Sequence, residues 1–186
     1  MIITVSETNG IRCQVSDLVL TVDADKTSGN LSLKTSLNSP IPTLNEFPDN
    51  LIAGAGEYEV DGIKVKGHEV LSESTEKELK TIYEVVFDEI KLCFLGGLKN
   101  GLDEATLDRL GEVDVLFFNV GAPYMSAKQA ATLIKQLEPK AIVPITKNIK
   151  ELGSELGQKP EIMEKWVVKG KDIAELNSKI IWINEK

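Results

Sequence analysis

The stretch of sequence that decides the fold reads Ala53-Gly-Ala-Gly-Glu-Tyr-Glu-Val-Asp-Gly-Ile-Lys-Val65. Apolar and polar residues alternate on both sides of Asp61-Gly62, and Asp-Gly between alternating runs is a strong short-range signal for a β-hairpin. Gly54 and Gly56 are interpreted as serving a tight backbone path, because no helix N-terminus follows them to hold a phosphate. The stretch therefore predicts two antiparallel strands joined by a tight turn.

The rest of the first half also reads as β structure. A second hairpin is predicted over residues 81–95, turning at Asp88-Glu89. Residues 38–50, with three prolines, and the polar residues 69–78 are expected to be loops. Further strands are predicted from short apolar or alternating runs at residues 2–5, 11–15, 18–22 and 31–37.

The second half changes to alternating helices and strands. Helices are predicted at residues 103–110, 126–137 and 149–156, the second with Ser126 as its N-cap. Strands are predicted at residues 114–119, 141–145, 166–168 and 179–183. No fixed-period repeat or low-complexity linker divides the chain. A single domain over residues 1–186, with two sheets covered by helices, fits this order.

Composition narrows the functional classes. The chain has 186 residues and a net charge of −8, and its lysines are interleaved with glutamates. This pattern argues against nucleic-acid binding, which needs clustered basic side chains. No apolar run reaches the roughly 20 residues of a membrane span, and the N-terminus lacks a signal-peptide pattern. Cys13 and Cys93 are expected to be free thiols, so a cytoplasmic protein is the interpretation.

Several motifs in the same order resemble a known family. Residues 53–65 resemble the "GPGEYEV-x-G" hairpin of small bacterial proteins identified as Zn-dependent hydrolases of the metallo-β-lactamase fold. Residues 92–98 resemble the family strand ending in "H-L-G-D-L", and residues 102–116 and 138–144 resemble two later segments. The resemblance implies an α/β fold of the αββα sandwich type, with two mixed sheets flanked by helices.

The metal ligands of that family are missing here. Its zinc hydrolases use an H-x-H-x-D-H loop, an Asp at a "G-D" turn and a later His, which together hold two metals and generate hydroxide near neutral pH. The whole chain contains one histidine. The positions that match those ligands hold other residues: Ser36, Asn38, Pro40, Ile41, Gly97 and Thr146.

The sequence thus predicts what we call the vestigial pocket, a remnant of the family's active site. Neither a catalytic residue nor a metal ligand is predicted in it, and no cofactor is expected. His68 is interpreted as an ordinary loop histidine, with the alternative of a lone acid or base at the pocket edge. The residues assigned to the vestigial pocket are Ser36, Asn38, Gly97, Thr146 and His68.

Two functional hypotheses remain open, with a third that the composition disfavours. The first is a metal-free, catalytically inactive member that acts as a binding or structural module. The second is a hydrolase-like enzyme with metal-independent chemistry, which requires an enclosed polar pocket and a perturbed titrating group. The third is a metal hydrolase with unexpected ligands. The expected partner is a protein or small molecule, not nucleic acid or a membrane, and a homo-oligomer is compatible with the sequence.

Overall fold

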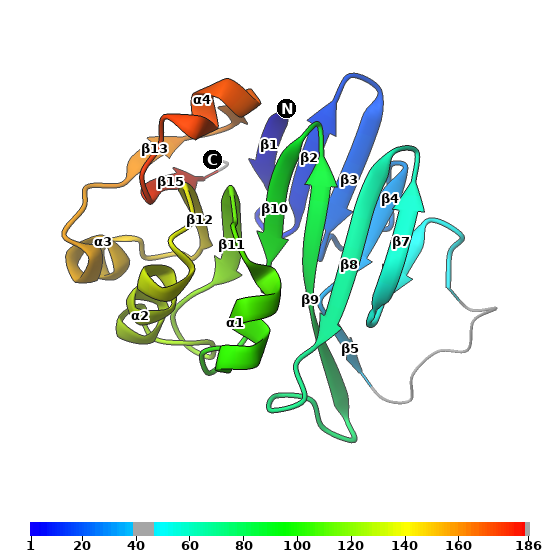
Figure 1. The fold of residues 1–186 in the computed structure, drawn as a ribbon, viewed down its shortest axis with the longest axis horizontal. Coiled ribbons are helices and arrows are strands. Elements are labelled where there is room, and N and C mark those ends of the chain that lie inside the picture. Colours follow the sequence, from blue (N-terminus) through cyan, green and yellow to red (C-terminus); the bar gives the residue numbers. More distant parts are fainter. Residues whose placement is uncertain (39–46, 185–186) are drawn as a thin grey trace.

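Two mixed β-sheets pack face to face in the computed structural model, which describes residues 1–38 and 47–184 (Figure 1). The first sheet has six strands in the order β14-β1-β2-β3-β4-β6. Its strands are β1 (Ile2–Val5), β2 (Ile11–Val15), β3 (Leu18–Val22), β4 (Leu31–Lys34), β6 (Leu51–Ala53) and β14 (Trp166–Val167). Antiparallel pairs join β14, β1, β2 and β3, whereas β3, β4 and β6 are parallel.

The second sheet has nine strands, eight of them in the order β13-β15-β12-β11-β10-β9-β8-β7, with β5 paired to β9. It is antiparallel from β7 to β10 and parallel from β10 to β13. Its first strands are β5 (Ser36–Asn38), β7 (Gly56–Val60), β8 (Ile63–Glu69), β9 (Glu78–Phe87) and β10 (Ile90–Phe94). The later ones are β11 (Val115–Asn119), β12 (Ala141–Ile145), β13 (Glu161–Met163) and β15 (Lys179–Ile183).

Both predicted hairpins are confirmed. Strands β7 and β8 pair with Val60 opposite Ile63, and β9 and β10 pair with Phe87 opposite Ile90. Each two-residue turn has positive φ at both positions, at Asp61-Gly62 and at Asp88-Glu89. Such turns match the right-handed twist of the strands that they join.

Two apolar cores lie on the two faces of the larger sheet. One fills the space between the sheets, and the other lies between the larger sheet and helices α1 (Glu104–Leu110), α2 (Ala127–Leu137) and α3 (Lys150–Leu156). Helix α4 (Gly170–Ala174) instead contributes Ile173 to the core between the sheets. The predicted architecture of two mixed sheets with helices is confirmed. Within the described residues, helices α1, α2 and α3 all pack on the face of the larger sheet that points away from the smaller sheet.

Local signals place the helix ends as predicted. The Ser126 side chain accepts a hydrogen bond from the Gln129 backbone N–H, and Gln129 reaches back to Ser126 N, which completes a capping box. Asp103 caps α1 in the same way by accepting from Thr106 N. This contact lowers the pKa of the Asp103 carboxyl, because the bond stabilises its charged form.

The structure differs from the sequence-based expectation in several short segments. The strand predicted at residues 31–37 is two strands, β4 and β5, which belong to different sheets. Strand β13 and helix α4 were not predicted, because three and five residues are too few for a periodic signal. Most of the predicted loop at residues 38–50 lies outside the described residues.

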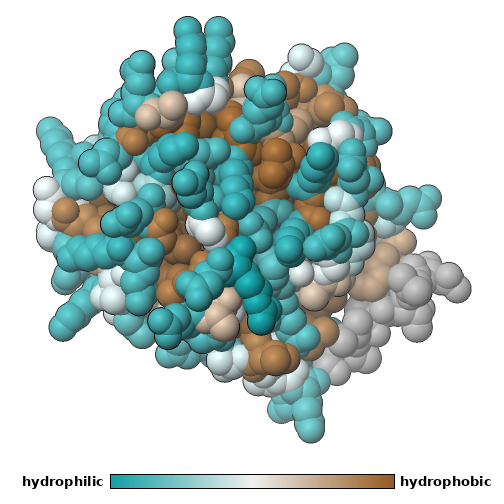
Figure 2. All heavy atoms as spheres, viewed as in Figure 1, coloured by the Kyte–Doolittle hydropathy of each residue, from teal (hydrophilic) through white to brown (hydrophobic). Residues whose placement is uncertain are grey.

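The exposed surface is mixed in character. Hydrophilic side chains cover most of the face in Figure 2, with hydrophobic atoms visible between them. The large exposed apolar side chains are distributed over several elements: Ile2, Tyr58, Leu71, Val86, Ile162 and Val167. None of the described helices has the length and apolar character needed to cross a bilayer.

Tyr83 on β9 ties the two sheets together. Its ring is completely buried, and its hydroxyl donates to Lys34 O at 3.0 Å. The same oxygen accepts a hydrogen bond from Gly54 N at 2.9 Å. Burial raises the pKa of the phenol, so it stays protonated at neutral pH. The link positions β9, whose first residues lie in the site described below.

We expect Tyr83→Phe to lower the free energy of unfolding by about 1–3 kcal/mol, because two backbone groups in the interior lose their partner. Urea unfolding measures the difference. Tyr58→Phe is the matched control, since the Tyr58 hydroxyl donates to Ala55 O at an exposed position. It is expected to change stability by less than about 0.5 kcal/mol. Equal effects of the two substitutions would contradict the assigned role of Tyr83.

Candidate functional site

A polar cavity of about 280 Å³ opens at one end of the core between the sheets. It lies beside the carboxyl ends of β3, β10 and β11, the edge at which α/β proteins commonly bind ligands. We call it the strand-end cavity. Its floor includes Phe94 and Phe117, whose rings stack with centroids 4.7 Å apart. Its main polar lining residues are Asp23, Ser36, Glu78, Lys80, Asn119 and Tyr124.

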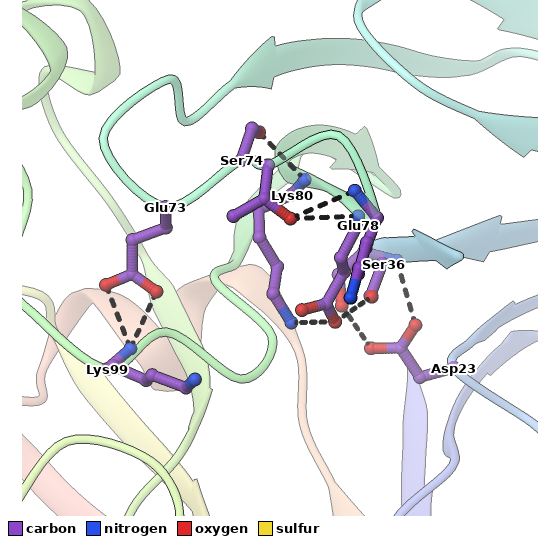
Figure 3. Close-up of polar contacts among 10 residues, drawn as sticks. Asp23, Ser36, Glu73, Ser74, Glu78, Lys80 and Lys99 are labelled. Atoms are coloured by element: carbon purple, nitrogen blue, oxygen red, sulfur yellow. Dashed lines mark hydrogen bonds and ion pairs between the residues drawn. The ribbon is translucent and has the colours of Figure 1, made fainter. Parts of the chain in front are cut away.

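An ion pair between Lys80 and Glu78 occupies this cavity (Figure 3). The Lys80 ammonium lies 2.6 Å from Glu78 Oε1, and Ser36 Oγ donates to the same oxygen at 2.6 Å. The three residues meet because Ser36 on β5 pairs directly with Lys80 on β9. Lys80 first, and Ser36 second, lower the pKa of the Glu78 carboxyl by stabilising its charge.

The loop before β9 holds Lys80 in place. The Lys80 backbone N–H donates to Ser74 Oγ, and its carbonyl accepts from Val70 N. Glu73, in the same loop, accepts hydrogen bonds from the backbone N–H group of Lys99 (Figure 3). It also accepts one from the backbone N–H group of Asn100. The loop is thereby joined to the segment that follows β10, which forms another wall of the cavity.

Asp23, directly after β3, is held by Thr35. Its two carboxylate oxygens accept from Thr35 N at 2.8 Å and from Thr35 Oγ1 at 2.6 Å. Thr35 in turn packs on Gly96, whose φ of +61° lies in the left-handed region. A Cβ at position 96 would overlap the Thr35 side chain. Glycine at this position therefore allows the loop after β10 to approach β4.

Gly97 packs against an aromatic ring. A Cβ on Gly97 would overlap the ring of Tyr124, which lies in the loop after β11. The Tyr124 ring thus fills the space that a side chain at position 97 would need. Tyr124 thereby contributes to the cavity wall beside Asn119.

The structure separates the five residues predicted to form the vestigial pocket. Ser36 and Gly97 line the strand-end cavity. Thr146 lies in an adjoining cavity of about 570 Å³, which shares Asn119 and Tyr124 with the first. Asn38 is exposed at the end of β5 and does not line either cavity. Pro40 and Ile41, which match family ligand positions, lie outside the described residues.

The histidine does not line the cavity, and its predicted loop position is wrong. His68 lies in β8, which extends further than its apolar alternation indicated. Its Nε2 atom is 2.8 Å from Glu84 Oε1, and Glu84 Oε2 is 3.3 Å from the Lys91 ammonium. The His68 and Glu84 side chains are only 10% and 11% exposed, so their contact is a largely shielded structural hydrogen bond.

Five of the six main polar lining residues were not predicted from the sequence: Asp23, Glu78, Lys80, Asn119 and Tyr124. A signal existed for Asp23 and Asn119, because each is a polar residue at or just beyond the end of a buried strand. Glu78 and Lys80 gave no such signal, because they lie in a charged stretch that resembles a solvated loop. Their position depends on the pairing of β5 with β9, which is a long-range contact.

Comparison with known proteins identifies the family. The model of the β-lactamase superfamily domain matches residues 14–146, which is more than half of the chain. The chain belongs to the β-lactamase superfamily. No curated protein matches the sequence.

Solved structures of this superfamily share the metallo-β-lactamase fold of the chain. A protein from Thermotoga maritima assigned to the Zn-dependent hydrolases superposes with a TM-score of 0.76 at 19% identity, covering 98% of this chain and 97% of its own. Igni18, a metallo hydrolase from Ignicoccus hospitalis, has a TM-score of 0.67 at 13% identity over 99% and 95%. YhfI from Bacillus subtilis, a metallo-β-lactamase fold protein, has 0.65 at 9% over 98% and 95%. At these identities the likeness establishes the fold alone.

The residues of the cavity do not fit the zinc pair of a superfamily hydrolase. Within the described ranges, 1–38 and 47–184, no group of three or more His, Cys, Asp or Glu is placed to hold a metal ion. The carboxylates of Asp23 and Glu78 are already engaged, and the ammonium of Lys80 would repel a cation. Cys13 is buried elsewhere, and burial raises the pKa of its thiol to about 12, which disfavours the thiolate that a metal requires.

Gly96→Ala is expected to lower the free energy of unfolding by about 2–4 kcal/mol, because the new methyl group must adopt a left-handed backbone and displace Thr35. Urea unfolding tests this. Gly101→Ala is the matched control, since nothing lies within 4 Å of a Cβ there. A Gly96→Ala protein as stable as the control would show that the contact between the loop after β10 and Thr35 is dispensable.

Proposed function

We propose that this superfamily member works without a metal, as a binding module whose ligand occupies the strand-end cavity. It is not a zinc hydrolase under this proposal, although solved structures of similar fold carry that assignment. A shared fold does not transfer chemistry, which depends on the residues of the site.

The observation that carries the proposal is the Lys80 ammonium inside the cavity. A metal-activated hydroxide needs cations held by neutral imidazoles and carboxylates. In this cavity the buried cation is the Lys80 side chain itself. It is one of the lining residues, and its partner is Glu78. The positive charge is fixed by β9 and its loop, so the site has an electrostatic centre without a cofactor.

Metal-independent hydrolysis is less well supported. The Ser36 hydroxyl donates to the Glu78 carboxylate inside the cavity. An efficient general base needs a pKa near the working pH, whereas the pKa of Glu78 is lowered. A carboxylate of this kind is a poor acceptor for the Ser36 proton. The same contacts are well suited to holding the cavity in a defined shape.

A fragment screen by NMR tests binding directly. The ¹⁵N-labelled protein is mixed, in the presence of a metal chelator, with a library of small neutral, cationic and anionic polar fragments. We expect fragments that bind to shift the backbone amide signals of Gly96, Gly97 and Asn119, because these residues line the cavity. The amide of Gly62, in the remote β7–β8 turn, is the internal control.

Two results would contradict the proposal. In the first, no fragment shifts the three cavity amides more than the amide of Gly62. In the second, the shifts appear only when the chelator is replaced by Zn²⁺, which would mean that the site needs a metal to bind its ligand.

A further inference from the structure

We infer that the strand-end cavity selects a neutral polyhydroxylated molecule, of the size of a monosaccharide or a small polyol, over charged ligands. The inference depends on the proposed binding function and adds the ligand class. It is carried by the signs and positions of the charges that line a small cavity.

The charges in the cavity oppose ligands of either sign. Its lining carries two carboxylates, on Asp23 and Glu78, and one ammonium, on Lys80. At about 280 Å³ the cavity is slightly smaller than the roughly 300–1,000 Å³ of pockets that bind drug-sized ligands. Any charged group that enters is close to a like charge, an anion to Asp23 and Glu78 and a cation to Lys80. The opposite charges are already engaged, because Glu78 and Lys80 pair with each other and Thr35 donates to both oxygens of Asp23. A charged ligand group also loses its hydration when it enters the cavity, which costs free energy.

The same lining suits hydroxyl groups. A hydroxyl donates one hydrogen bond and accepts two, so it can bind to a carboxylate and to an ammonium at once. Glu78 Oε2, which accepts no hydrogen bond from the described residues, provides an acceptor, and the Lys80 ammonium, which contacts only Glu78 Oε1 among them, provides donors. Because a polyol carries such a group on successive carbon atoms, it can satisfy both kinds of partner without adding charge.

Two further polar groups, the side chains of Asn119 and Tyr124, are available at the end of β11 and in the loop that follows it. The backbone N–H groups of Asn119 and Tyr124 donate to Gly96 O and Gly121 O. Among the described residues, the Asn119 amide and the Tyr124 hydroxyl have no hydrogen-bond partner, and both residues line the cavity. Both are half-buried, so a ligand can reach them. The Tyr124 ring adds an apolar surface for the C–H groups of a sugar ring.

A series on one carbon skeleton tests the selectivity. Glucose is compared with glucosamine, which adds an ammonium, and with glucose phosphate, which adds an anion; ribose and inositol extend the neutral set. Binding to the wild-type protein is measured by ligand-observed saturation-transfer NMR and calorimetry. We expect at least one neutral member to bind, and glucosamine and glucose phosphate to bind at least about tenfold more weakly than glucose.

Variants test the assigned contacts. Asn119→Ala and Tyr124→Phe are each expected to weaken binding of the neutral ligand about tenfold, the loss of one hydrogen bond. Tyr124→Phe keeps the ring against Gly97, so it remains informative if Asn119→Ala fails to fold. Asp23→Asn is expected to reduce the preference for glucose over glucose phosphate, because it removes one negative charge. Lys135→Ala, on the exposed face of α2, is the unchanged control.

The outcomes separate this inference from the proposed function. If fragments bind the cavity but no neutral polyol does, or if a charged member binds as well as glucose, the ligand class is wrong and the binding module stands. If nothing binds the cavity, or if binding needs Zn²⁺, the proposed function itself is wrong.

Discussion

The ion pair between Lys80 and Glu78 is the interaction on which the site depends. A buried ammonium is costly unless a partner compensates for its lost hydration, and removing one member of such a pair leaves an uncompensated charge. Glu78 supplies that partner at 2.6 Å, and Ser36 adds a hydrogen bond to the same oxygen. The loop before β9 fixes the Lys80 backbone through Ser74, so the charge is held by the fold itself.

The surrounding contacts are consistent with a site rebuilt around this pair. Thr35 occupies both oxygens of Asp23 and packs on Gly96, while the Tyr124 ring fills the space beside Gly97. These contacts engage the Asp23 carboxylate and fill the space beside Gly96 and Gly97. The sheets, the two cores and the strand order of the metallo-β-lactamase fold are retained.

Much of the fold could be predicted from local sequence signals. The turn at Asp61-Gly62 and the capping box at Ser126 act within a few residues, and both are confirmed. The site could be predicted only in part. Ser36 and Gly97 line the strand-end cavity, whereas His68 does not line it and contacts Glu84.

The rest could not be predicted because it depends on contacts distant in sequence. Lys80 looks like one of several surface lysines until β5 pairs with β9 and brings it opposite Ser36. Asp23 is recognised as part of the site only once Thr35, which donates to its carboxylate, is seen to pack against Gly96. Neither relation leaves a periodic trace in the sequence, whereas the single histidine of the chain can be read directly from its composition.

The central claim, that the chain needs no metal, is tested most directly by its metal content. The purified, untagged protein is incubated with excess Zn²⁺, desalted and analysed by mass spectrometry for bound metal. We predict only a trace, because the cavity contains a fixed ammonium and no set of three free ligands among the described residues. Zinc retained at about one or two ions per chain, the occupancy of a mono- or dinuclear hydrolase centre, would contradict it.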